Sequence, residues 1–156
     1  MKVIFLDIDG VLASLDYIRS LSLLKEPNPD SYGYSFDPRC VRNLQYILNC
    51  VPDARIVISS SWKSMGVMNL AHMWHIRNLP GDIIGTTPDL LRTTIESSRG
   101  MEIQKWLEDE DGIDSYVIID DDGDMLGSQM ERFVRTDPMI GLTTADSMKA
   151  VRILNQ

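Results

Sequence analysis

The chain has 156 residues, of which 44% are hydrophobic and 24% charged, a composition that is ordinary for a globular domain and excludes disordered and fibrous classes. Its formal net charge is −8. Such a chain repels phosphates, so extended nucleic-acid binding by general electrostatics is excluded. No apolar run approaches the roughly 20 residues of a membrane helix, and the apolar start before Asp7 is too short for a signal peptide. We therefore expect a cytoplasmic protein with no membrane partner.

Two cysteines and two histidines limit the available chemistry. Cys40 and Cys50 fall on one predicted helix, where their spacing corresponds to a rise of roughly 15 Å, beyond the reach of a disulfide. We expect both to be small core residues in a reducing compartment. His72 and His75 are predicted to be neighbours on a helix surface, so neither a zinc site nor a histidine-based catalytic dyad is expected.

The apolar pattern predicts strands that alternate with helices along the chain. The predicted strands are Val3 to Leu6, Arg55 to Ile58, 83–84, Tyr116 to Ile119 and, more weakly, Arg132 to Val134. The predicted helices run from Pro38 to before Pro52, over about 66 to 78, from Gly100 to Leu107 and from Thr144 to Leu154, with a further helical stretch at Leu15 to Leu24. On the last helix, the core-facing positions are expected to be Ala145, Met148, Val151 and Leu154. Because the strongest strands are continuous apolar runs, both faces of the sheet should be covered, which indicates a parallel α/β fold.

Three predicted strands end in polar residues that a parallel sheet would bring to one edge, where ligands of such sheets bind. These residues are Asp7 and Asp9, Ser59 and Ser60, and Asp120 and Asp121. Crowded carboxylates raise one another's pKa and favour a neutralising cation. Oxygen ligands, with no histidine or cysteine nearby in sequence, favour Mg2+ over zinc. An aspartate beside such a metal can also act as a nucleophile and form an aspartyl-phosphate.

Four motifs occur in a fixed order over nearly the whole chain. They are Asp7-Ile8-Asp9-Gly10-Val11-Leu12 after the first strand, Ser59 or Ser60 after the second, Arg99 before a helix, and Asp120-Asp121 after a later strand. Together they resemble the motifs of the haloacid dehalogenase-like (HAD) phosphohydrolase superfamily. Ser60-Ser61-Trp62-Lys63, the stretch from Arg99 to Leu107 and the stretch from Thr136 to Thr143 are more specifically similar to small HAD domains grouped with Swiss army knife RNA-repair proteins.

The resemblance implies a three-layer, Rossmann-like parallel sheet with a minimal cap insertion, and a Mg2+-dependent phosphomonoester hydrolase that works through an aspartyl-phosphate. Asp7 would be the nucleophile, and Asp9 the general acid and then the base. Arg99 would neutralise the phosphoryl group and hold Asp7. The implied metal-binding residues are Asp7, Asp9, Asp120 and Asp121.

Further polar residues of these motifs are candidates for substrate contact. Ser59 or Ser60 would donate a hydrogen bond to a phosphoryl oxygen, Gly10 would let the backbone turn beside the phosphate, and Lys63 is an additional candidate. Ser61 is equally consistent with a helix cap. Asp122 and Asp124 are interpreted as solvated loop acids.

We expect one domain over residues 1–156, in which residues 13–36 form a small cap or flap insertion. This insertion is too short for a separate cap domain, so the site should be open to bulky substrates. It carries Tyr17, Arg19, Tyr32 and Tyr34, which could stack on a base or meet a second phosphate. The alternative is that the tyrosines pack the loop onto the core. The expected partner is a phosphorylated small molecule, preferably a nucleotide or a nucleic-acid terminal phosphate.

Other readings remain open at this point. The substrate could be another small metabolite or a protein phosphate, or the fold could be a non-catalytic binding module, although every expected catalytic residue type is present. A receiver domain is disfavoured because its phosphoacceptor is a lone aspartate after a central strand, whereas Asp7 and Asp9 follow the first predicted strand here. Asp120, Asp122, Asp124 and Glu131 match positions of a calcium-binding loop, but Met125 replaces the required glycine, and the preceding segment is predicted as a strand instead of a helix.

Overall fold

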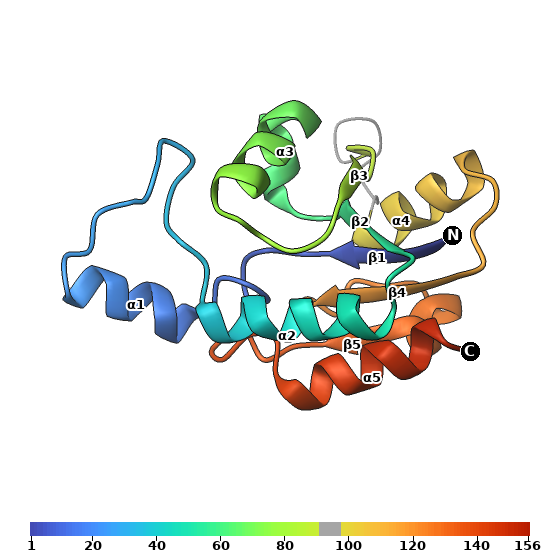
Figure 1. Cartoon of the computed structure of the whole chain (residues 1–156). Coiled ribbons are helices and arrows are strands. Elements are labelled where there is room, and N and C mark those ends of the chain that lie inside the picture. The colour runs from blue at the N-terminus through green and yellow to red at the C-terminus, as the bar shows by residue number, and fades with distance from the viewer. Residues whose placement is uncertain (91–97) are drawn as a thin grey trace.

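The computed structural model describes residues 1–90 and 98–156. Within them, five parallel strands form one sheet in the order β3-β2-β1-β4-β5 (Figure 1). The strands are β1 (Lys2–Leu6), β2 (Ala54–Ile58), β3 (Ile83–Thr86), β4 (Ser115–Asp120) and β5 (Phe133–Arg135). The parallel α/β fold predicted from the apolar runs is confirmed.

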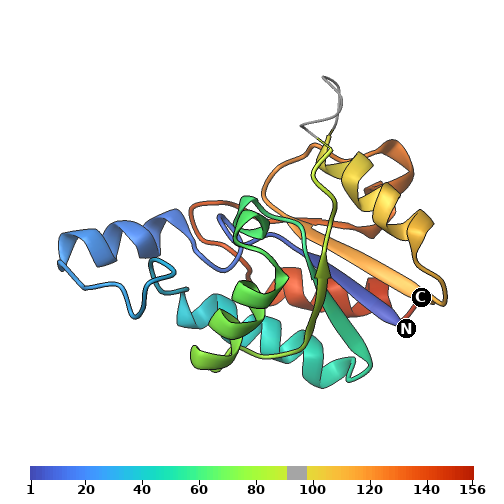
Figure 2. The same cartoon turned by 90° about the horizontal axis from the view of Figure 1, so that it is seen from above.

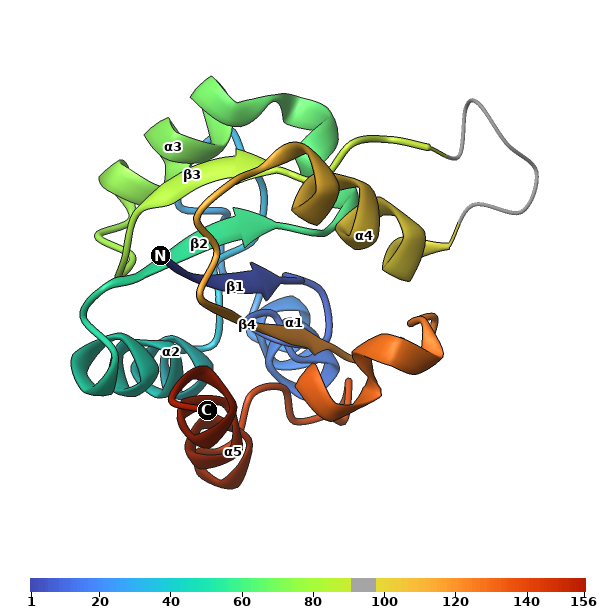
Figure 3. The ribbon, with the colours of Figure 1, turned by 90° about the vertical axis from the view of Figure 1, so that its right-hand side faces the viewer.

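Helices cover both faces of this sheet and make three layers. They are α1 (Leu15–Leu23), α2 (Pro38–Cys50), α3 (Val67–Ile76), α4 (Arg99–Asp109) and α5 (Thr144–Leu154), with short 3-10 helices η1 (Ser61–Met65) and η2 (Gly127–Arg132). Figure 3 shows α2, α3 and α5 on one side of the sheet and α4 on the other. The sequence sets two of the helix starts locally, because Asp37 caps α2 with Pro38 at the first position and Thr143 forms a capping box with Asp146 on α5.

The central strand β1 divides the core into two clusters. Ile4 and Leu6 belong to the cluster that contains the buried side chains of α2, α3 and α5. Val3 and Phe5 belong to the cluster under α4, where the Phe5 ring lies edge-on to Trp106 with centroids 5.3 Å apart. Successive residues of a strand point to opposite faces, so burial of both faces explains the unbroken apolar sequence of β1.

Two expectations about helix faces were wrong. Cys40 is buried as predicted, but Cys50 is exposed on the solvent side of the last turn of α2, whereas the next residue, Val51, packs into the core. On α5 the buried side chains are Ser147, Ala150, Ile153 and Leu154, and Met148 is 46% exposed. The small side chains Ser147 and Ala150 lie on the buried face of a helix that packs against α2 and β4, and the longer methionine is turned out to solvent.

The order of the strands places a ligand-binding crevice at the carboxyl end of β1. The chain proceeds from β1 to β2 and β3 on one side and then crosses to β4 on the other side of β1. In open parallel sheets, ligands bind beside the point where the order of the strands reverses in this way. In the register, Leu6 is paired with Ile58 of β2 and Ile119 of β4. The residues that follow these three lie at the same edge. Figure 2 shows both termini together at the opposite end from α1.

Arg77, at the end of α3, links the 13–36 segment to the rest of the protein by hydrogen bonds. Its guanidinium donates hydrogen bonds of 2.9 and 2.8 Å to the two carboxylate oxygens of Asp30, and it also donates to the carbonyl oxygens of Gly33 and Tyr34. The same group lies 5.0 Å from the centre of the Phe36 ring. The side chain of Arg77 is only 7% exposed, so one buried arginine organises a segment in which α1 has no buried residue.

Replacing Arg77 with methionine should lower the free energy of unfolding by about 3 kcal/mol, because it leaves a partly buried carboxylate without its partner. Chemical denaturation of the purified variant measures this loss. Arg42→Met is the matched control, since Arg42 is exposed on α2, and its effect should stay within about 0.5 kcal/mol. Equal effects of the two substitutions would contradict the anchoring role of Arg77.

Candidate active site

Three carboxylates converge at the carboxyl ends of β1 and β4. Asp7 follows β1 directly and is 4% exposed, and Asp120 ends β4 and is 1% exposed. Asp121 lies beside them, and one ligand oxygen from each of the three residues falls within 4.8 Å of the others. Among the described residues, this is the group of carboxylates arranged to hold a metal ion.

Arg99 contacts two of these carboxylates from the first position of α4. Its Nη1 atom is 3.0 Å from Asp7 Oδ2 and 2.7 Å from Asp120 Oδ2. The neighbouring Gly100 permits this placement, because a Cβ atom there would lie 2.7 Å from the Leu126 nitrogen and 2.9 Å from Met125 Cα. A side chain at that position would push the start of α4, and with it Arg99, away from the carboxylates.

Burial and mutual repulsion shift the pKa values in this cluster. Burial, followed by the charge of Asp120, raises the pKa of Asp7 to about 8, although Arg99 opposes the shift. Burial also raises the pKa of Asp120, again against the effect of Arg99. Burial alone would lower the pKa of Arg99, but the two aspartates raise it above its usual value. One guanidinium therefore does not balance the carboxylates, and the site favours a further cation.

Gly10 makes room for Asp121. Its φ angle is +80°, and a Cβ atom on this residue would lie 2.6 Å from Asp121 Cγ. The carbonyl oxygen of Gly10 accepts a hydrogen bond of 2.8 Å from Thr136 Oγ1, which follows β5. A glycine is therefore needed here for its left-handed conformation and for the close approach of the carboxylate.

Two aromatic residues hold Asp9 in place. Trp62 Nε1 donates to Asp9 Oδ2 at 3.1 Å, and the Tyr34 hydroxyl donates to Asp9 Oδ1. Burial and the neighbouring Asp9 raise the pKa of Tyr34 well above its usual range, so its hydroxyl stays protonated. Asp9 is not one of the three clustered carboxylates, and its role as a metal ligand stays a prediction.

The two candidate serines differ in their surroundings. Ser59 continues the register of β2 at the level of Asp7 and is buried, and in the part of the chain that the structure describes its Oγ has no hydrogen-bond partner. Ser60 Oγ accepts from the Trp62 amide at 3.3 Å and caps η1. The cap that the sequence allowed for Ser61 is therefore formed by Ser60 instead.

Two adjoining pockets open over these residues. One has a volume of about 250 Å³ and is lined by Asp7, Asp9, Gly10, Leu15, Ser61, Arg99, Asp121, Asp122 and Pro138. The other, of about 240 Å³, is lined by Ser60, Ser61, Lys63, Arg99, Glu102, Asp122 and Asp124. They share Ser61, Arg99 and Asp122 and so form one continuous depression above the carboxylates.

Lys63 lies in the second pocket but is already paired. Its Nζ is 2.7 Å from Glu102 Oε2 and 3.0 Å from the carbonyl oxygen of Pro88. Glu102 is buried on α4, so this ion pair ties η1 to α4. The charge of Lys63 is therefore largely balanced inside the protein.

The remaining predicted contacts of the insertion are not brought to the carboxylates. The Tyr17 hydroxyl is bonded to Ser35 Oγ at 3.1 Å, and the Tyr32 hydroxyl to His72 Nδ1 at 2.6 Å. Arg19 is exposed on α1. Of the four residues proposed for substrate contact, only Tyr34 touches a predicted catalytic residue, and the contacts of the tyrosines favour the packing alternative.

Trp62, Glu102 and Arg77 are site-forming residues that sequence reasoning did not single out. Trp62 and Glu102 stand inside stretches that resemble the RNA-repair HAD domains, so the motif itself was the available signal. Arg77 carried no such signal, because its partners in the 30–36 segment are more than 40 positions away in the sequence.

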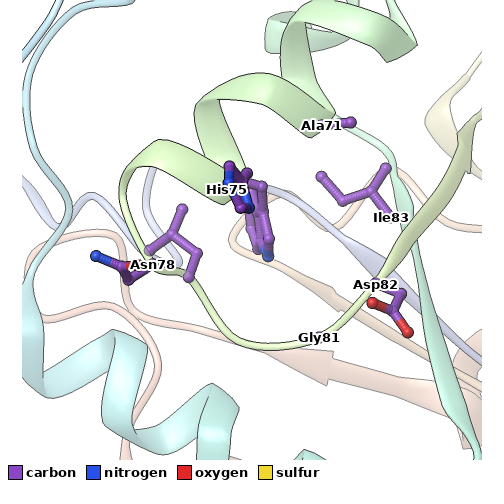
Figure 4. Close-up of a pocket in the computed structure, with 8 residues that line it drawn as sticks. Ala71, His75, Asn78, Gly81, Asp82 and Ile83 are labelled. Atoms are coloured by element: carbon purple, nitrogen blue, oxygen red, sulfur yellow. The ribbon is translucent and has the colours of Figure 1, made fainter.

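A separate pocket of about 460 Å³ lies between α3 and β3, and Figure 4 shows its lining. His75, Asn78 and Asp82 contribute its polar groups. None of the predicted catalytic or metal-binding residues lines it, so the chemistry is placed at the carboxylate cluster.

The calcium-loop reading is not supported by the geometry. Residues 115–120 form the strand β4 where that motif needs a helix. The Asp122 amide donates to Asp120 Oδ1, and the Asp124 amide donates to Asp122 Oδ1. The group of carboxylates that could hold a metal ion combines Asp120 with Asp7, which follows a different strand, and does not include Asp122 and Asp124.

A family model described as the HAD domain in Swiss Army Knife RNA repair proteins matches residues 3–147. The chain belongs to this family of HAD domains. The match covers all four motifs and the resemblance seen in the sequence is confirmed. No curated protein and no solved structure gives a significant match to the chain. Among the described residues, no helix is both long and apolar enough to cross a bilayer.

The residues of this HAD domain fit a divalent cation. The donors are carboxylate oxygens from three residues at the carboxyl ends of two strands, and such oxygens are the hard ligands that Mg2+ prefers. The excess negative charge left after pairing with Arg99 gives the cluster an electrostatic reason to bind one. Asp7 and Asp120 would hold the ion, with Asp121 beside them.

Changing Asp7 to asparagine should stabilise the metal-free protein, and more so at high pH. A carboxyl whose pKa rises from 3.8 to about 8 on folding adds stability below its ordinary pKa, and this contribution is lost as the pH rises through about 8. The melting temperature of Asp7→Asn in a chelator should exceed that of wild type by about 3 °C or more at pH 8, the shift expected for about 1 kcal/mol. At pH 5 the difference should be much smaller. The same difference at both pH values would contradict the assigned shift.

Proposed function

We propose that this HAD domain is a Mg2+-dependent phosphomonoester hydrolase that acts through an aspartyl-phosphate. The observation that carries the proposal is the contact of one arginine with both Asp7 and Asp120 at the strand ends, beside a pocket that Asp9 also lines. A nucleophile, a proton donor and a counter-charge thus face one small cavity. We also propose that residues 1–156 form one domain with 13–36 as its insertion.

In the first step, a carboxylate oxygen of Asp7 attacks the phosphorus atom. The bond from phosphorus to the leaving oxygen breaks as Asp9 transfers its proton to that oxygen. The products are the alcohol and a phosphoryl group on Asp7. Arg99 balances charge on the phosphoryl oxygens and keeps Asp7 oriented. When bound, the metal ion held by Asp7 and Asp120 supplies charge neutralisation for the approaching phosphate.

In the second step, Asp9, now a carboxylate, takes a proton from a water molecule whose oxygen attacks the phosphorus atom. The bond between phosphorus and Asp7 breaks, inorganic phosphate leaves, and both aspartates return to their starting states. We assign the phosphoryl-binding hydroxyl to Ser59 because it is level with Asp7 and its Oγ has no hydrogen-bond partner among the described residues. The backbone amide of Ser60, the next residue in the chain, is adjacent in sequence to this hydroxyl.

The substrate proposed is a nucleotide or a terminal phosphate of a nucleic acid. Two features support it: the family is named for RNA-repair proteins, and the insertion is short. The site then admits the end of a large molecule, whereas the net charge of −8 disfavours a long electrostatic track. The alternative is a phosphate of another small metabolite or of a protein.

Binding of Mg2+ should raise the melting temperature, because the ion relieves the repulsion among the clustered carboxylates. Asp120→Asn should remove most of this increase, whereas Asp124→Asn is the matched control and should leave it nearly intact. Thermal melts with and without about 10 mM Mg2+, which is about 100-fold above an assumed Kd of roughly 0.1 mM, measure the effect. A larger loss in Asp124→Asn, or a much greater stabilisation by Ca2+, would place the metal elsewhere.

Phosphate release from a panel of phosphomonoesters tests the activity and the substrate class together. With Mg2+, wild type should release phosphate, and Asp7→Asn should reduce turnover by at least about 1,000-fold, since it removes the nucleophile. Nucleotides and oligonucleotides with terminal phosphates should give higher kcat/KM than sugar phosphates.

Undiminished turnover in a folded Asp7→Asn protein would refute the aspartyl-phosphate mechanism. An equal or better kcat/KM for sugar phosphates would refute only the substrate class.

A further inference from the structure

The carboxylate of Asp9 receives one hydrogen bond on each of its two oxygens. Trp62 Nε1 reaches Oδ2 at 3.1 Å, and the Tyr34 hydroxyl reaches Oδ1. A carboxylate oxygen has two acceptor positions, so one position on each oxygen is left over. These two donors fix the direction in which the remaining positions point.

The two donors come from separate parts of the chain and support each other. Tyr34 belongs to the 13–36 insertion and Trp62 to η1, which follows β2 directly. Their rings meet edge-on, with centroids 5.5 Å apart, and the Phe36 ring packs on Trp62 at 5.4 Å. Neither side chain can reorient without disturbing this aromatic cluster.

Arg77 fixes the backbone that carries Tyr34. It donates at 2.8 Å to the carbonyl oxygen of Tyr34 itself and at 3.1 Å to that of Gly33. The position of the Tyr34 hydroxyl is therefore determined by contacts that begin on α3. A series of contacts thus connects Arg77, at the end of α3, to the backbone of Tyr34 in the insertion and, through the Tyr34 hydroxyl, to Asp9.

We propose that Tyr34 and Trp62 are positioning residues that orient Asp9 for proton transfer to the leaving oxygen. The 13–36 insertion would then contribute to the chemical step itself, in addition to bounding the site. This inference rests on the proposed function, because it assigns the positioning to the same two-step reaction. In the proton-transfer step, the proton leaves Asp9 and binds to the oxygen that is released from phosphorus.

The dependence of the rate on the leaving group separates positioning from simple structural support. Phenyl phosphate and p-nitrophenyl phosphate have almost the same shape, but the nitrophenolate departs readily without a proton. Misalignment of the general acid should therefore slow the first substrate more than the second. The kcat/KM of each substrate covers the steps up to cleavage of the first bond to phosphorus. The ratio of the two kcat/KM values does not depend on the fraction of the protein that is active.

Tyr34→Phe and Trp62→Phe each remove one donor and keep an aromatic ring. With Mg2+ present, each should lower kcat/KM for phenyl phosphate by about tenfold and that for p-nitrophenyl phosphate by less than about twofold. In an Asp9→Asn background, neither substitution should change the ratio further, because the group that they position is gone.

Tyr46→Phe is the matched control, because it also removes one tyrosine hydroxyl and Tyr46 is exposed on α2. It should not alter the ratio. The two donor variants are made separately, so a failure of one to fold leaves the other as the test.

Equal losses for both substrates, or no loss, in Tyr34→Phe and Trp62→Phe would overturn the positioning role. In that case wild type is still active, and the proposed function stands. If wild type releases phosphate from neither substrate nor from any member of the panel, the proposed function fails, and the positioning role fails with it.

Discussion

Buried negative charge at the ends of β1 and β4 is the constraint on which the rest of the site depends. Asp7 and Asp120 are almost fully withdrawn from water, and withdrawal of an ion costs several kcal/mol unless it is compensated. Arg99 compensates part of this cost by contacting both residues. The fold therefore holds a region that is electrostatically incomplete by itself, and a bound cation would lower its free energy. Under the proposed function, activity and stability would be set by the same few groups.

The same constraint explains how an acidic chain can act on an anion. Arg99 is engaged by two aspartates, and Lys63 is engaged by Glu102, so neither cation offers a full free charge to an incoming phosphate. Under the proposed function, a metal ion held by the carboxylates would supply attraction that works against the net charge of −8. Phosphate binding would then follow metal binding, because the described acidic groups of the pocket repel a phosphate.

Much of the fold and the order of the motifs could be predicted from the sequence, because local signals determine them. Continuous apolar runs gave the strands, and a capping aspartate followed by Pro38 gave the start of α2. Contacts between distant segments could not be predicted. Trp62 and Tyr34 meet at Asp9 although 53 and 25 positions separate them from it, and no periodicity encodes that meeting. The face of α5 was misjudged because its packing partner, and not its own pattern alone, decides which small side chains are buried.

The tyrosines of the insertion show how contacts formed on folding bear on a role that was predicted from residue type. The hydroxyls of Tyr17, Tyr32 and Tyr34 are all bonded inside the protein, and the three residues are partly buried. These contacts favour packing, and base stacking by the rings stays a prediction. These hydrogen bonds, together with those of Arg77, hold the 13–36 insertion in a defined conformation although it has no core of its own. The pocket beside Asp7 and Asp9 is also lined by Leu15, Ser61, Asp122 and Pro138. Under the proposed function, these described residues would contact a substrate close to its phosphate. Discrimination among substrates would then come from the groups adjacent to the phosphate, a geometry that would accept the end of a polymer as readily as a single nucleotide.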